Sequence, residues 1–298
     1  MKILITGAGG LLGSKIAYLA LKKSYEVYAA YLTNLPSNGF PIKLDISNKK
    51  MVFKIIKDIN PDAIFHCAAL TDVDKCEIDK ELAKRINING TKFIAKIAKK
   101  INAFLIYIST DYIFDGFKGM YKEEDEPNPI NFYGYSKLLG EKAIEEIDGE
   151  YLIARTSVIY GSKPASGKTN FALWILDNLK KNQNIKILID QYVSPTLNTN
   201  LAEMLIEAYE RKITGIYHIA GANRVSRYEF ALKLAEFFNL NKNLILKAKM
   251  DEMNWIAKRP KDTSLDISKA NNIFKVKPIN LNEALNNLKG ELKNCLME

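Results

Sequence analysis

Short apolar runs alternate with longer amphipathic stretches along the first half of the chain. The apolar runs fall at residues 2–6, 25–31, 42–45, 63–67, 104–108 and 151–155. Such runs are typical of strands buried on both faces, whereas residues 48–59 and 77–100 have the spacing of helices. The pattern predicts an α/β fold with a doubly wound parallel sheet, a Rossmann fold. Within the last of these helices, we expect Asn87 or Asn89 to face the strand ends.

The pattern becomes looser after residue 158. The expected elements are a polar loop at 161–167, helices at 171–179, 200–209 and 228–238, strands at 185–189, 216–220 and 244–247, and irregular segments around 255–260. Because the strand at 216–220 can return to the main sheet, we expect a dinucleotide-binding domain of residues 1–158 and 191–222. Residues 159–190 and 223–298 are expected to form a smaller, partly discontinuous α+β substrate domain that closes over a ligand cleft.

The composition is that of an ordinary globular protein. The 298 residues are 47% hydrophobic and 26% charged, which allows a sizeable core. The net charge is +9, but the lysines are spread along helical faces, so we expect no nucleic-acid partner. A strand begins at Lys2 and no apolar run could cross a bilayer, so we expect neither a signal peptide nor a membrane partner. Cys67, Cys76 and Cys295 fit no metal spacing, which indicates a reducing cytoplasm.

A glycine turn joins the first strand to the first helix. Gly7, Gly10 and Gly13 lie at three-residue intervals, although the usual Gly-x-Gly-x-x-Gly pattern fails at Leu12. Glycines let the backbone approach a pyrophosphate, and the amino end of a helix favours its charge. We therefore expect Gly7, Gly10, Leu11 and Leu12 to bind a nicotinamide dinucleotide.

Other strand ends supply further candidates for cofactor binding. Asp45 is placed to face an adenine ring, with Ile46 beside it, and the small residues Ala68 and Ala69 would let a cofactor lie close to the backbone. A carboxylate at the end of the second strand would bind the ribose hydroxyls of NAD and repel a 2′-phosphate. The chain has none there. We therefore expect NADPH as the cofactor, with NADH possible.

The residue types needed to reduce a carbonyl lie between Ser109 and Lys137. Thr110 follows a buried strand, and Tyr133 and Lys137 are four residues apart on a predicted helix, so both leave the same face. A phenol has a pKa of about 10, and a neighbouring ammonium favours its ionised form. We expect Lys137 to lower the pKa of Tyr133, and Thr110 or Ser109 to hydrogen-bond the carbonyl oxygen. Only two histidines are present, which disfavours His-based catalysis.

Together these motifs resemble the extended short-chain dehydrogenase/reductase family and, within it, the dTDP-4-dehydrorhamnose reductases. The likeness spans nearly the whole chain. Besides the glycine turn, it rests on residues 68–77, 109–116, 128–141, 155–157, 190–196, 258–260 and 265–269.

The resemblance implies hydride transfer from NAD(P)H to the C4 carbonyl of a dTDP-4-keto-6-deoxysugar, in nucleotide-sugar biosynthesis. Tyr133 would protonate the alkoxide, Lys137 would hold the nicotinamide ribose, and Thr110 would orient the carbonyl. Three further positions match family residues near the sugar: Thr71, Val73 and Tyr112. Asn170 and Arg259 would be partners for the nucleotide diphosphate, with a surface salt bridge as the alternative for Arg259.

Two departures from the family pattern leave alternatives open. Members often have a tryptophan that packs on the sugar where this chain has Val158, so the sugar can differ. Some bacterial members form a magnesium-bridged dimer through carboxylates, one of them on the first helix, where this chain has Ser14 and Lys15. We therefore expect no metal, and a monomer or a homodimer. The alternatives are another nucleotide-sugar reductase or epimerase, or a non-catalytic subunit that resembles the β subunit of methionine adenosyltransferase.

Overall fold

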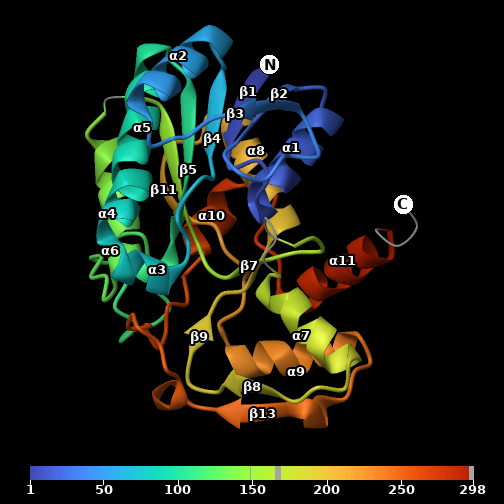
Figure 1. Ribbon diagram of the computed structural model, residues 1–298. Helices are drawn as coiled ribbons and strands as arrows, with labels where there is room; N and C mark the ends of the chain where they lie inside the picture. Colours follow the sequence, from blue (N-terminus) through green and yellow to red (C-terminus); the bar gives the residue numbers. More distant parts are fainter. Residues whose placement is uncertain (148, 165–168, 295–298) are drawn as a thin grey trace.

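A seven-stranded parallel sheet forms the centre of the larger part of the molecule (Figure 1). The computed structural model describes residues 1–147, 149–164 and 169–294. The strands lie in the order β11-β6-β5-β4-β1-β2-β3, and all neighbours are parallel. This confirms the predicted doubly wound sheet. Its strands are β1 (Lys2–Thr6), β2 (Glu26–Tyr31), β3 (Phe40–Lys43), β4 (Ala63–His66), β5 (Phe104–Thr110), β6 (Tyr151–Thr156) and β11 (Gly215–His218).

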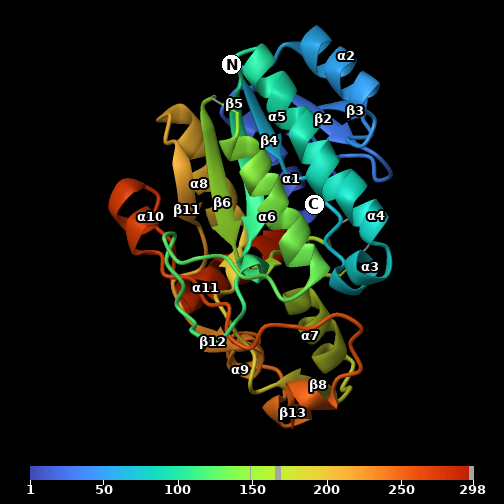
Figure 2. The ribbon, with the colours of Figure 1, turned by 90° about the vertical axis from the view of Figure 1, so that its left-hand side faces the viewer.

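The strand order reverses at β1, because β2 and β3 lie on one side of it and β4, β5 and β6 on the other. In such sheets the crevice at the carboxyl ends beside the reversal is where ligands bind. Helices cover both faces of the sheet, with α5 and α6 in front of it in Figure 2. One face carries α2 (Lys49–Ile59), α5 (Thr91–Lys100) and α6 (Phe132–Glu145), and the other carries α1 (Leu11–Lys22) and α8 (Asn198–Glu210).

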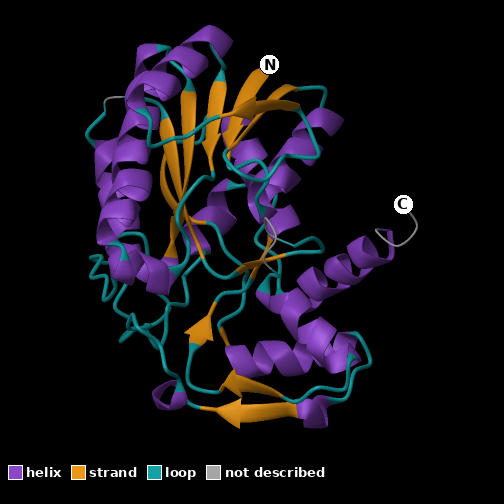
Figure 3. Cartoon of the chain, viewed as in Figure 1, coloured by secondary structure: helices purple, strands orange, loops and turns teal. Residues whose placement is uncertain are grey.

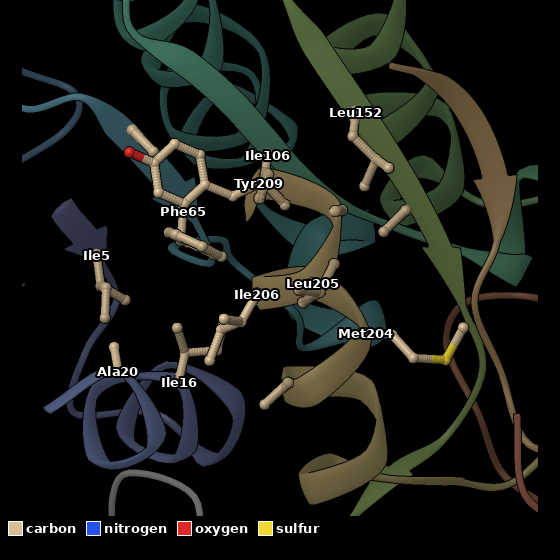
Figure 4. Close-up of a cluster of buried hydrophobic side chains, with 14 of the residues drawn as sticks. Ile5, Ile16, Ala20, Phe65, Ile106, Leu152, Met204, Leu205, Ile206 and Tyr209 are labelled. Carbon is tan, nitrogen blue, oxygen red and sulfur yellow. The ribbon is translucent and has the colours of Figure 1, made fainter. Parts of the chain in front are cut away.

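One hydrophobic core lies between the sheet and the two helices α1 and α8. Figure 4 shows Ile16 of α1 and Tyr209 of α8 among side chains of the strands, including Ile5 and Phe65. The Tyr209 ring meets the Phe65 ring edge-on, with 6.4 Å between centroids. Each fully buried side chain of this size contributes about 1.5–3 kcal/mol. The turn between β1 and α1 is therefore held between two elements that are fixed in the core.

The helix expected at residues 77–100 is a series of shorter segments. Asp79 ends the first of them, and its carboxylate accepts a hydrogen bond from the Leu82 amide at 2.8 Å, which starts a new helix. A π-helical segment follows and turns Asn87 inward. The Asn87 side chain accepts a hydrogen bond from the Leu70 amide and donates one to the Leu70 carbonyl oxygen. This confirms that one of the two asparagines faces the strand ends. The segments are α3 (Val73–Ile78), α4 (Lys80–Ala83), the π-helical Lys84–Gly90, and α5.

A smaller body lies below the sheet in Figures 1 and 3. Its core is formed by helices and by a two-stranded parallel sheet. The helices are α7 (Phe171–Lys180), α9 (Arg227–Phe237) and α11 (Leu281–Asn294), and the strands are β8 (Ile185–Leu188) and β13 (Ile245–Ala248). Two short strand pairs complete this region: β7 (Ile159–Tyr160) with β10 (Thr196–Leu197), and β9 (Tyr192–Val193) with β12 (Val225–Ser226). Single-turn 3-10 segments are Asp111–Ile113, Lys242–Leu244 and Met250–Glu252.

Several boundaries differ from the expected ones. β3 was expected at residues 42–45 but pairs with β2 through residues 40–43, so Asp45 lies beyond the strand. Helix α11 was not expected, although Leu285 and Leu288 on it are fully buried. Ala270 of α10 (Ser268–Ile273) and the following Phe274 pack in the core beside the sheet.

The expected division into two domains stays a prediction. A boundary drawn from packing would give residues 268–274 to the larger part, since they share its core. Part of the loop expected at 161–167 and the expected thiol Cys295 lie outside the described residues.

Candidate active site

A cleft of about 860 Å³ opens at the carboxyl ends of β1, β4 and β5. This volume lies toward the upper end of the range for small-molecule sites. Nearly all of the predicted site residues line it. They are Gly7, Gly10, Leu11, Leu12, Asp45, Ile46, Ala68 and Ala69 on the predicted cofactor side, and Thr71, Val73, Thr110, Tyr112, Tyr133 and Lys137 on the side predicted for substrate and catalysis.

The glycine turn at the end of β1 leaves room for a pyrophosphate. Gly7 has φ of 69°, and a Cβ there would lie 2.9 Å from the backbone of Ala68. Gly10 precedes α1 and provides no side-chain cap, and the first turn contains no acidic residue. The amino end of α1 therefore presents uncapped amides and a positive dipole to the cleft. The chemistry of this turn fits a dinucleotide phosphate.

The adenosine side of the cleft is set by the ends of β2 and β3. Asp45 is fixed there, since its Oδ1 accepts hydrogen bonds from the Ser47 amide and hydroxyl at 2.9 and 2.8 Å. The four residues after Ala30, from Tyr31 to Asn34, line the cleft without a carboxylate. Gly9 also lines it, and a Cβ there would lie 2.3 Å from the Asn34 carbonyl oxygen. Sequence reasoning passed over Gly9, although it lies within the glycine turn.

Thr110, Tyr133 and Lys137 come together, as predicted. Tyr133 lies in the first turn of α6, which begins where the Asn131 side chain accepts a hydrogen bond from the Gly134 amide at 2.9 Å. The Thr110 side chain at the end of β5 lies close enough to the Tyr133 hydroxyl to oppose the rise in its pKa. Lys137 follows one turn later and is only 3% exposed. The strand and the helix therefore deliver three polar groups to one wall of the cleft.

Burial controls the protonation of this group. It raises the pKa of Tyr133, and the nearby Thr110 side chain opposes it only in part. Burial lowers the pKa of Lys137 to about 7, while the Glu141 carboxylate raises it. The expectation that the Lys137 ammonium lowers the pKa of Tyr133 below its ordinary value was wrong, because desolvation of the phenol outweighs that attraction.

Asp111 is a buried carboxylate beside the catalytic threonine. It accepts hydrogen bonds from Thr110 Oγ1 at 3.1 Å, Ser157 Oγ at 2.7 Å and Thr263 Oγ1 at 2.6 Å. Burial raises its pKa, and the three hydroxyls oppose that rise. Sequence reasoning gave Asp111 no role, since two of its partners are distant in sequence: Ser157, which follows strand β6, and Thr263, which is 152 residues away. The carboxylate orients Thr110 and ties three segments together.

Two predicted substrate residues, Asn170 and Arg259, do not line the cleft. Asn170 caps α7 through the Leu173 amide and donates to the carbonyls of Gly161 and Lys163. These bonds use its amide within the fold. Arg259 donates from Nη1 to Asp74 Oδ1 at 3.1 Å and also bonds a backbone carbonyl in its own loop. The structure therefore gives both side chains contacts within the fold, while the charge of Arg259 also acts on Tyr112, which lines the cleft. Their assignment to the diphosphate stays a prediction.

Arg227, which was not predicted, lines the cleft instead. Its Nε donates to Gln191 Oε1 at 3.2 Å, and its guanidinium lies 4.8 Å from the centroid of the Phe171 ring. Its positive charge lowers the pKa values of Asp111 and Tyr112 in opposition to burial. No motif marks this arginine, because it reaches the cleft only through the packing of α9 against α7.

Other features of the described residues bear on the remaining expectations. No group of three His, Cys, Asp or Glu side chains there could hold a metal ion, and Lys15 pairs with Glu291 at 3.0 Å. The expected absence of a metal stays a prediction.

Burial lowers the pKa values of His66 and His218 to about 3, so both are neutral. None of the helices in the described ranges has the length and apolar character needed to span a membrane.

Comparisons with known proteins bear on the chemistry of this cleft. A family model, the RmlD substrate binding domain, matches residues 1–294. The chain is 34% identical to dTDP-4-dehydrorhamnose reductase of Aggregatibacter actinomycetemcomitans, over 97% of this chain and 98% of that protein. It is also 34% identical to methionine adenosyltransferase 2 subunit beta of Xenopus laevis, over 90% of this chain and 81% of that protein. The crystal structure of dTDP-4-dehydrorhamnose reductase from Bacillus anthracis in complex with NADP matches with a TM-score of 0.88 and 32% identity, over 97% of this chain and 99% of that one.

Proposed function

Because the chain belongs to the RmlD substrate binding domain family, we propose that it is an NADPH-dependent reductase of a dTDP-4-keto-6-deoxysugar, similar to dTDP-4-dehydrorhamnose reductase. One observation carries the proposal. Thr110, Tyr133 and Lys137 converge in the same cleft as the glycine turn at Gly7. NADH is a possible second cofactor. The reaction would take place in the cytoplasm on a nucleotide sugar, with neither a nucleic acid nor a membrane as partner and with the chain as a monomer or a homodimer.

The protein's part of the reaction begins with binding and orientation. When bound, a nicotinamide cofactor would supply a hydride to the sugar carbonyl. The uncapped amides of α1 would hold its pyrophosphate, and the small side chains of Ala68 and Ala69 leave room against the backbone. Lys137, which lines the same cleft, would bond the hydroxyls of the nicotinamide ribose.

Proton delivery is assigned to Tyr133. Because burial raises its pKa, the phenol keeps its proton at neutral pH and can give it to the oxygen of the reduced carbonyl. Thr110, oriented by Asp111, hydrogen-bonds that oxygen as negative charge develops on it. The positive charge of Lys137 then stabilises the phenolate that remains.

Substrate recognition is assigned to the side of the cleft opposite the glycine turn. Thr71, Val73 and Tyr112 line the region next to Tyr133, and the Tyr112 and Tyr133 rings are 6.0 Å apart between centroids. We assign the diphosphate to Arg227 in place of Asn170 and Arg259, since its guanidinium lines the cleft. A guanidinium can bind phosphate oxygens through two parallel hydrogen bonds.

The direct test is NADPH oxidation with dTDP-4-dehydrorhamnose, followed by absorbance. Turnover by the wild type that falls roughly 100- to 10,000-fold in Tyr133→Phe supports the proposal, because that is the range for loss of a proton donor. Tyr135→Phe is the matched control, since Tyr135 lies on the same helix and is 45% exposed. Absence of turnover with every keto-sugar nucleotide tried would contradict the proposal.

A second candidate is a regulatory subunit, favoured by the 34% identity to methionine adenosyltransferase 2 subunit beta. Such a subunit would act by binding a partner, and an inherited Tyr133 and Lys137 do not exclude it. The discriminating result is a stable complex with a methionine adenosyltransferase, together with no reduction of any keto-sugar. Reduction of a keto-sugar that depends on Tyr133 favours the reductase.

A further inference from the structure

Lys137 is buried against an aromatic face. Its Nζ lies 4.0 Å from the ring centroid of Tyr107, which is fully buried on β5. A cation at this distance over a ring is attracted by the ring's negative face, and the attraction grows when water is excluded. The ring is therefore in a position to offset part of the cost of burying the Lys137 charge.

The Tyr107 ring is fixed on several sides. Its hydroxyl donates to the Lys137 carbonyl oxygen at 3.3 Å, and the Thr91 side chain lies close enough to oppose the rise in the pKa of that hydroxyl. A Cβ at Gly140 would lie 2.3 Å from the Tyr107 hydroxyl oxygen, so only glycine allows α6 to approach this closely. The His66 ring lies beside it, with 5.6 Å between centroids. The ring under the ammonium is thus held by two strands and two helices.

The Lys137 ammonium is stabilised by the Tyr107 ring and by one carboxylate, that of Glu141. Glu141 raises the pKa of Lys137, but its carboxylate also holds Arg155 through three hydrogen bonds of 2.8 to 3.2 Å. Buried His66 is neutral and supplies no negative charge. Burial raises the pKa of each other acidic group that faces Lys137, so these groups are neutral near pH 7. They are Cys67, Cys76 and Tyr133.

We propose that Tyr107 is a positioning residue for the reductase reaction, whose ring face holds the Lys137 side chain as an ammonium and aims it at the cleft. The inference rests on the function proposed above, because it concerns the state of the same lysine. Nothing in the sequence motif marks Tyr107, which reads there as one apolar residue of a buried strand.

The proposal fixes the sign of a pH effect. Lys137 is active as an ammonium, so the rate falls as pH rises through its pKa, which burial lowers to about 7. Reducing the negative charge of the Tyr107 ring face lowers the Lys137 pKa further. The fall in rate at high pH then occurs at lower pH. A cation–π contact in a desolvated site corresponds to a shift of roughly one pH unit.

The test compares two aromatic rings that both lack the Tyr107 hydroxyl and that differ in the negative charge of the ring face. Tyr107→Phe keeps the ring face and loses the hydroxyl, and replacement by 3,4,5-trifluorophenylalanine withdraws charge from the same face. The ε-carbon resonance of Lys137, labelled with carbon-13 and identified by its loss in Lys137→Arg, is titrated with pH in each protein. We expect the Lys137 pKa to stay near the wild-type value in Tyr107→Phe and to drop by roughly one unit with the fluorinated ring.

The kinetic pH profile provides the second measurement, with Phe104→Leu as a control for altering a buried aromatic residue on the same strand. The pH at which the rate falls should shift in the protein with the fluorinated ring and should stay unchanged in Phe104→Leu. Equal Lys137 pKa values with the plain and the fluorinated ring would overturn the inference. Because the NMR titration needs no turnover, that result is distinct from failure of the proposed function.

Discussion

The two walls of the cleft are built in different ways. The wall on the sheet side comes from the ends of strands and the turns that follow them. Gly7, Ala68 and Thr110 are each placed there by the strand that they end or follow. The opposite wall is assembled from segments far apart in the chain. Arg227 reaches it from α9 and is held by Gln191, which lies 36 residues earlier.

The two walls differ in what determines the position of their binding groups. On the sheet side, the conformation of the backbone and the helix dipole bind the ligand, so binding there depends on few side chains. On the opposite side, the position of a charge depends on how α7 and α9 pack. Substitutions on the sheet side should therefore weaken binding of the cofactor strongly. Substitutions on the other side should change the affinity for the sugar nucleotide or the stability of the protein.

The largest effect is expected for Gly7→Ala. Gly7 has a positive φ, and a Cβ at this position would lie 2.9 Å from the Ala68 backbone, which leaves no room for a methyl group. Strain of this kind costs about 1–3 kcal/mol, and the turn must shift to relieve it. Since misplacement by about 1 Å can cost roughly 100-fold, we expect NADPH affinity to fall by about that factor. Isothermal titration calorimetry measures the loss.

Gly290→Ala is the matched control for that substitution. Gly290 lies in α11, and a Cβ there meets nothing within 4 Å. Alanine is favoured over glycine inside a helix, so the variant should be more stable by about 0.5–1 kcal/mol with unchanged NADPH affinity. If Gly7→Ala bound NADPH as well as this control, backbone control of the sheet-side wall would be refuted.

A smaller effect, confined to the sugar nucleotide, is expected for Arg227→Ala. Loss of a hydrogen bond to a charged group costs about 1.5–3 kcal/mol, which corresponds to a roughly 10- to 100-fold rise in KM. Arg259→Ala is the comparison, because Arg259 bonds Asp74 and does not line the cleft. We expect its KM to change less than about twofold. The reverse order in steady-state kinetics would restore Arg259 as the diphosphate residue.

The same contrast explains what the sequence could predict. The sheet, the glycine turn and the Tyr133 with Lys137 pair depend on local spacing, and the structure brings them together as expected. The predicted role of Asn170 stays untested, but its amide is used by its own loop and helix, a competition that sequence spacing does not reveal. The protonation of Tyr133 was misjudged because burial is a property of the packed structure and not of the motif.

A moderate loss of stability, without a change in substrate affinity, is expected for Asn170→Ala. The side chain caps α7 and satisfies two carbonyls, and removing a cap costs about 1 kcal/mol. Urea denaturation measures the stability, and the KM for the sugar nucleotide should stay within about twofold of the wild type, because the residue does not line the cleft. Asn170→Asp keeps the acceptor for the Leu173 amide but cannot donate to the carbonyls of Gly161 and Lys163, so it should also lose stability. A large rise in KM with unchanged stability would return Asn170 to the substrate site.

An effect of similar size is expected for the choice between the two cofactors. The end of β2 lines the cleft from Tyr31 to Asn34 without a carboxylate that would repel a 2′-phosphate. A tenfold tighter binding of NADPH than of NADH corresponds to about 1.4 kcal/mol of added stability at equal, saturating concentrations. NADPH should therefore raise the Tm by more than NADH does in differential scanning fluorimetry. Replacing Leu32 or Thr33 by Asp should reverse the order, since a carboxylate there would face the phosphate. Equal Tm shifts in the wild type would show that this wall does not discriminate between the cofactors.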